Sequence, residues 1–189
     1  HRNVDVRRVV AVALGLVGDM SVVYALIDAL RDEDAQVNQM AEHGLWAIWF
    51  RSGSNEAARP FKQGVQLLVD ENYDSALVCF KRAVRIDPTF AEAYNQCAIA
   101  HFFLGQYRES LVACSTAVKR VNGHFGAIAN MGHCYTQMGQ LAKALRCYRK
   151  ALRINPSMSA VEQAIERLQQ RYQDVNDESG EYLGEYVPV

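Results

Sequence analysis

The chain has 189 residues, 50% of them hydrophobic and 22% charged, the balance of an ordinary globular protein that can build a core. Its formal net charge of −1 gives no overall field that would attract nucleic acid or an acidic membrane surface. The longest apolar stretch, residues 9–17, is too short to cross a bilayer. We therefore expect neither nucleic acid nor a membrane among its partners.

The first residue is His1 and not an initiator Met, so we expect the sequence to be a fragment of a longer protein. The five cysteines are odd in number and form no CxxC pair, which favours small packing residues in a reducing, cytoplasmic compartment. His133 and Cys134 are adjacent and point to different faces of a helix, so we expect no metal site. The cysteines are Cys79, Cys97, Cys114, Cys134 and Cys147.

An apolar stripe with helical spacing opens the chain and returns 31 residues later. Between the two stripes, residues 22–30 form a second amphipathic pattern, closed by the acidic turn 31–34, where Asp34 can cap the next helix. This pattern predicts a helical hairpin followed by one helix of a second unit. The two stripes are Val6, Val9, Val10, Ala13, Leu14 and Val17, and then Val37, Met40, Ala41, Gly44, Leu45 and Ile48.

Residues 5–37 resemble the short HEAT-like repeats, including those of the phycobilin lyase group. The resemblance covers about 45 residues, and we assign residues 1–53 to a HEAT-like segment truncated at its start. It implies an alternative function for the protein. In that case the chain would be an accessory or lyase-like protein whose HEAT-like segment binds a tetrapyrrole or its carrier protein.

Two aromatic residues, Trp46 and Phe50, lie one helical turn apart opposite the apolar stripe, with His43 alongside. Exposed aromatics of this kind are typical of binding hot spots. The second HEAT-like unit, however, lacks its partner helix, and the first helix after the linker at 51–55 could take that place. We expect a buried junction and one continuous superhelix, with an exposed second binding patch as the alternative.

Beyond the linker the sequence repeats every 34 residues, and a period of this length is typical of helical solenoids. Units at 57–90, 91–124 and 125–158 each predict two helices, with turns at 70–72, 105–106 and 139–140. Small residues recur where the paired helices should touch. The pairs are Gly64 with Ala76, Ala98 with Ser110, and Gly132 with Ala144.

These units resemble tetratricopeptide repeats (TPRs) over about 102 residues. The resemblance implies an all-α, right-handed solenoid, in which the HEAT-like hairpins lead into three TPR units. The middle unit departs most, with His101, Cys114 and Asn122 at positions where the pattern has two aromatics and a proline. The matching residues are Gly64, Leu67, Ala76, Phe80, Ala83, Pro88, Tyr94, Ala98, Gly105, Tyr107, Ala117, Gly132, Tyr135, Gly139, Ala144, Tyr148, Ala151 and Pro156.

Capping signals agree with these boundaries, because Thr89-x-x-Glu92 and Ser159-x-x-Glu162 both have the capping-box pattern. Residues 159–173 predict a terminal helix with one apolar stripe that covers the last hairpin. The end of the array is basic, whereas residues 174–189 hold five acids and no base. We expect a solvated tail. The alternative is a tail that folds back or mediates self-association.

No catalytic motif, phosphate loop or cofactor pattern appears, so we expect a protein–protein interaction scaffold or adaptor, not an enzyme. The TPR resemblance places the partner-binding groove on the first helix of each hairpin, where it would hold a peptide or helix. Amides there would bond the peptide backbone, and apolar residues would anchor it. The predicted groove residues are Phe61, Val65, Asn95, Ile99, Phe102, Asn130 and His133.

The best-known TPR clamp holds the C-terminal carboxylate of chaperone tails with Lys, Asn and Arg. The corresponding positions here carry no cation, so we predict that the chain is not such a clamp. An alternative for Phe61, Val65 and Leu68 is that they pack against the HEAT-like segment. The clamp positions are Phe61, Val65, Gln96, Gly126 and Asn130.

Overall fold

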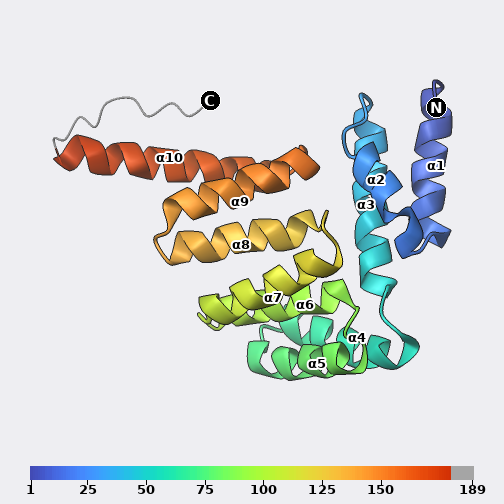
Figure 1. Ribbon diagram of the computed structural model, residues 1–189, viewed down its shortest axis with the longest axis horizontal. Helices are drawn as coiled ribbons and strands as arrows, with labels where there is room; N and C mark the ends of the chain where they lie inside the picture. The colour runs from blue at the N-terminus through green and yellow to red at the C-terminus, as the bar shows by residue number, and fades with distance from the viewer. Residues whose placement is uncertain (180–189) are drawn as a thin grey trace.

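The computed structural model describes residues 1–179, and the side chains of residues 1–170. Within this range the chain is helical and has no strand, which confirms the predicted all-α solenoid (Figure 1). The elements are α1 (Val4–Val17), η1 (Met20–Val22), α2 (Val23–Ala29), α3 (Ala35–Arg51), α4 (Asn55–Val69), α5 (Tyr73–Ile86), α6 (Ala91–Phe103), α7 (Tyr107–Arg120), α8 (Phe125–Gln137), α9 (Leu141–Ile154) and α10 (Ser159–Ser179).

Three helix pairs, α4–α5, α6–α7 and α8–α9, form stacked antiparallel hairpins (Figure 1). Each pair turns through one residue with positive φ, namely Glu71 (58°), Gly105 (72°) and Gly139 (70°). The next residue donates its N–H to the carbonyl five positions earlier, at 2.8–2.9 Å in all three turns. This bond is the helix-ending Schellman pattern, and it repeats every 34 residues as the sequence predicts.

The small residues of the first helices make room for an aromatic ring in two of the hairpins. A Cβ added at Gly64 would lie 2.7 Å from the ring of Phe80, and one at Gly132 would collide with Tyr148. The sequence predicts Ala76 and Ala144 as the partners of these glycines, but the nearest side chains are Phe80 and Tyr148. In the middle unit, Ala98 replaces the glycine and Cys114 replaces the aromatic residue. The alanine methyl group therefore occurs where no ring needs the space. The departure at position 114 thus fits the packing.

The N-terminal helices use their two apolar stripes differently. Gly15 and Gly44 bring α1 and α3 into close backbone contact, and the α3 stripe is buried under α1 and α2. Most of the α1 stripe, in contrast, faces solvent, with Val9 at 68% and Val17 at 86% exposure, while Leu14 packs against the core. Ion pairs join the first turns of α1 to the turn that precedes α3, from Arg7 to Asp32 (2.7 Å) and from Arg8 to Asp34 (2.6 Å).

The N-terminal helices stand across the edge of the repeat stack and do not extend it (Figure 1). The core around α3 includes Ala91, Val121 and Phe125, which lie where α6 and α8 begin. The expectations of one continuous superhelix, and of α4 as the partner helix of α3, are therefore wrong. The chain turns at the linker, and the large apolar side chains of α3 pack against the starts of the later helices instead of against α4.

The last helix, α10, covers the final hairpin with Val161 and Leu168, which are buried beside Tyr148 and Ala151. It continues to Ser179, six residues past the predicted end, because residues 159–179 contain no glycine or proline that would end the helix. The rest of the predicted tail, residues 180–189, lies outside the described residues. No helix in the described range is long and apolar enough to span a membrane.

Candidate protein-binding surface

The first helices of the three hairpins form the inner layer of the stack, because α4 contacts α6 and α6 contacts α8. Five of the predicted groove residues lie on these helices with half-buried side chains. None of the five is charged at neutral pH, and three are apolar. They are Val65, Ile99, Phe102, Asn130 and His133.

Two other predicted groove residues are buried and have no surface to offer a partner. Phe61 is 2% exposed and packs against Phe50, Phe80 and Phe90, with ring centroids 4.5–5.8 Å apart. This arrangement agrees with the alternative that Phe61 packs against the N-terminal segment. Asn95 is 1% exposed, and its amide is fully engaged inside the protein. We therefore remove both residues from the candidate surface.

His133 presents a hydrogen-bond acceptor on this face. Thr136 donates its hydroxyl proton to the Gly132 carbonyl (3.0 Å), so it accepts from the Tyr148 hydroxyl (3.2 Å). The Tyr148 oxygen in turn accepts from His133 Nδ1 (2.8 Å), which places the imidazole proton on Nδ1 and leaves a lone pair on Nε2. Burial lowers the pKa of His133, and this favours the neutral ring.

Asn130 is held by a buried polar network that runs through the inner layer. Its Nδ2 donates to Asn95 Oδ1 (3.0 Å), and Asn95 donates to Glu92 Oε1 (3.1 Å). Gln96 donates to the same oxygen (2.6 Å), while His124 Nε2 lies 2.9 Å from the other. The Ala127 N–H donates to His124 Nδ1, so a neutral His124 carries its proton on Nε2 and donates to Glu92.

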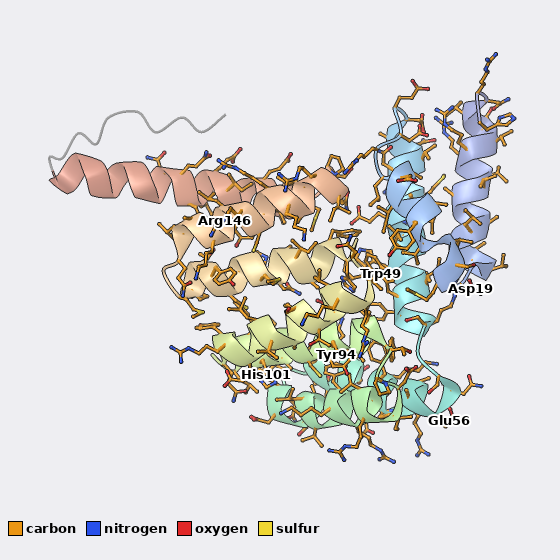
Figure 2. The ribbon with its side chains drawn as sticks, in the orientation of Figure 1. Asp19, Trp49, Glu56, Tyr94, His101 and Arg146 are labelled. Carbon is orange, nitrogen blue, oxygen red and sulfur yellow. The ribbon has the colours of Figure 1, made fainter. Side chains whose placement is uncertain are left out.

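The same network fastens the N-terminal segment to the repeats. The rings of Trp49 and His124 stack with centroids 4.2 Å apart and planes 12° apart. Trp46 lies beside Phe125 (5.4 Å) and fills the space left by Gly126. Figure 2 shows Trp49 on the side of α3 that faces the hairpins. The N-terminal segment and the repeats thus share one packed junction.

The predicted second patch is only partly available. Trp46 is half-buried in the junction, whereas Phe50 is 39% exposed and His43 is exposed. The expectation that the aromatic pair lies in a junction holds for Trp46, although the start of α8 covers it in place of α4. Phe50 does reach α4 through Phe61.

Sequence reasoning missed Trp49, Glu92 and His124, which connect the two parts of the molecule. Glu92 has the spacing of a capping-box residue, but its carboxylate turns inward, and α6 begins after Phe90 with no side-chain cap. The signal available was Trp49 itself, a large aromatic next to the apolar stripe of its helix. In the described part of the chain, no group of three His, Cys, Asp or Glu side chains could hold a metal ion.

Two models of the tetratricopeptide repeat match this sequence, one over residues 70–105 and one over residues 127–158. The solved structures most like it in shape include the Sgt2 TPR domain of Aspergillus fumigatus, with a TM-score of 0.63, 17% identity, and 72% of this chain and 91% of that chain covered. The chain carries tetratricopeptide repeats. Neither model covers α1–α3, so the HEAT-like assignment of that segment stays a prediction.

A second TPR structure, the first TPR of Spaghetti (RPAP3) bound to the HSP90 peptide SRMEEVD, has a TM-score of 0.61 and 20% identity. It covers 64% of this chain and 95% of that one. Among curated proteins, bimA of Emericella nidulans is 34% identical over 86 residues, which are 46% of this chain and 11% of the relative. A TPR repeat-containing protein of Rhizobium etli is 23% identical over 65% of this chain and 60% of its own length. The chain thus spans between a tenth and three fifths of these relatives.

Proposed function

We propose that the inner face of the TPR array binds a peptide or helical segment of a partner protein, and that the chain acts as a scaffold or adaptor. The observation that carries this proposal is a set of five half-buried, uncharged side chains on three adjoining helices. Val65, Ile99 and Phe102 supply apolar contacts, and Asn130 and His133 supply hydrogen bonds. Related TPR structures hold peptides of other proteins, which supports the same class of ligand here.

We also propose that this face does not clamp a terminal carboxylate. A clamp needs cations that bind both carboxylate oxygens, and the five residues of the face include none. His133, with its lowered pKa and free Nε2 lone pair, would instead accept a hydrogen bond from a peptide N–H. The ligands of this face should therefore be internal or extended peptide segments with apolar anchors.

The test is a peptide-display selection on the whole chain, followed by affinity measurements on two matched variants. Ile99→Ser/Phe102→Ser removes apolar groups from the inner face, and Val78→Ser/Val112→Ser removes exposed ones from the outer helices α5 and α7. We expect the inner variant to lose about tenfold or more in affinity, since each buried apolar contact contributes about 1 kcal/mol or more. The outer variant should bind like the wild type.

Three results would contradict the proposal. Equal binding by the inner and outer variants would place the ligand elsewhere. Tight binding of the SRMEEVD peptide, abolished when its C-terminus is amidated, would show a carboxylate clamp. Failure of any peptide to be enriched over a blank surface would count against peptide binding itself. Circular dichroism of both variants provides the control for folding.

Other expectations from the sequence remain proposals. TPR arrays are in general protein-interaction modules without catalytic activity, and we extend that assignment to this chain. We retain a cytoplasmic location and self-association through the acidic tail as predictions. The tetrapyrrole alternative also stays a prediction.

A further inference from the structure

A cavity of about 690 Å³ opens between α7, α8 and α9, away from the inner face. Its α8 residues include Met131 and Tyr135, whereas the inner face uses Asn130 and His133. Each helical residue turns by about 100°, so these two pairs lie on roughly opposite sides of α8. The cavity is therefore a separate site on the side of the second helices.

The rim of this cavity is basic. Lys119 comes from α7, and Lys143, Arg146 and Lys150 share one face of α9, while none of the described side chains that line the cavity is acidic. Figure 2 labels Arg146 on α9. Among the side chains of residues 1–170, no carboxylate forms an ion pair with any of these four cations. A cluster of unpaired cations around one cavity favours an anionic ligand.

The floor of the cavity is largely apolar, formed by Val118, Ile128, Met131 and Tyr135. The Lys143 Nζ atom lies 5.5 Å from the centroid of the Tyr135 ring, so this rim cation contacts an aromatic residue of the floor. Burial raises the pKa of the Cys147 thiol, which also lines the cavity, while the charges of Lys150 and Arg146 oppose that shift. A ligand that fits must pair carboxylates with apolar or aromatic side chains.

The end of this chain has that composition. Residues 180–189 read GEYLGEYVPV, with two glutamates, two tyrosines, a leucine, two valines and no base. We propose that this segment occupies the α7–α9 cavity, with Glu181 and Glu185 against the basic rim and its aromatic and aliphatic side chains on the floor. The segment comes from the same molecule. This site is independent of peptide binding on the inner face.

The path of the chain agrees with this assignment. Helices α9 and α10 run antiparallel, and α10 ends beyond the start of α9 (Figure 1). The end of α10 therefore lies toward the end of α9 that carries Lys143 and Arg146. The acids that precede residues 180–189, namely Asp174, Asp177 and Glu178, add to the negative charge of the same stretch of sequence.

Photo-cross-linking of the whole chain tests the proposal. Tyr186 is replaced by p-benzoylphenylalanine, which keeps an aromatic ring, and the cross-linked residues are mapped by mass spectrometry. We expect cross-links to residues that line the cavity, such as Met131, Tyr135 and Lys143. In a mixture of isotopically light and heavy protein, the cross-links should join light to light and heavy to heavy chains, and light-to-heavy cross-links would overturn the assignment to the same molecule.

Two charge-reversed variants decide whether the rim is responsible. Arg146→Glu/Lys150→Glu reverses rim charges, and Arg82→Glu/Arg149→Glu reverses two exposed charges that do not line the cavity. The rim variant should lower the cross-link yield about tenfold, because two attractions become repulsions, whereas the control should keep the wild-type yield. Adding Glu181→Lys/Glu185→Lys to the rim variant should restore it. Cross-links away from the cavity, equal yields in both variants, or no restoration would overturn the proposal.

Discussion

Three hydrogen-bond donors converge on the fully buried carboxylate of Glu92. Asn95 and Gln96 come from the same helix, but His124 lies 32 residues further along the chain. A local pattern can predict only the local bonds of Glu92, and it predicts the wrong one, a capping box. The direction of the side chain depends on a partner that the next repeat supplies. For the same reason the burial of Asn95 could not be predicted from its position on the helix.

Replacing Glu92 with Gln should destabilise the protein by about 2 to 3 kcal/mol, because the new NH₂ group would face donors and leave buried polar groups unpaired. The measurement is urea unfolding followed by tryptophan fluorescence, since Trp46 and Trp49 are the two tryptophans of the chain and both lie at the junction. Glu109→Gln, at an exposed position on α7, is the control and should leave the midpoint unchanged. An unchanged urea midpoint in Glu92→Gln would mean that the network does not stabilise the junction.

The helices themselves follow from sequence more directly than their arrangement does. Helix–turn–helix units with a 34-residue period, and turns at Gly105 and Gly139, depend on local spacing and on the positive φ that glycine allows. The place of α3 depends on which apolar surface its side chains meet. The stripes of α1 and α3 are nearly equivalent in sequence, yet one is exposed and the other buried. An apolar stripe predicts that a helix has a partner but does not identify that partner.

The first repeat keeps a glutamate where the other two have glycine, at φ 58°. A non-glycine residue in this region costs about 1 to 2 kcal/mol. Glycine would remove this cost, but it would also increase the entropy of the unfolded chain, which offsets part of the stabilisation. Glu71→Gly should therefore raise stability by up to about 1 kcal/mol, seen as a higher midpoint in urea. Glu71→Ala removes the same carboxylate without freeing the backbone and should give no gain. Equal effects of the two substitutions would assign any change to charge.

At the scale of the whole molecule, the N-terminal helices lie against the starts of α6 and α8 and leave the inner face of the repeats uncovered along their later turns (Figure 1). Ile99, Phe102 and His133 lie in those later turns, where they remain half-exposed. The basic cavity of α7–α9 lies on the other side of α8. The chain thus offers two separate surfaces of different chemistry, one neutral and one cationic.

Binding of a partner to the neutral inner face would change the environment of the residues on that face. The most direct test of this binding is an NMR titration of the whole isotopically labelled chain with a peptide from the display selection. We expect the largest shifts at Ile99, Phe102, Asn130 and His133, with smaller ones through Asn95 toward Glu92. Shifts confined to the cavity of Lys119 and Lys150, or to the exposed stripe of α1, would contradict this expectation and place partner binding on another surface.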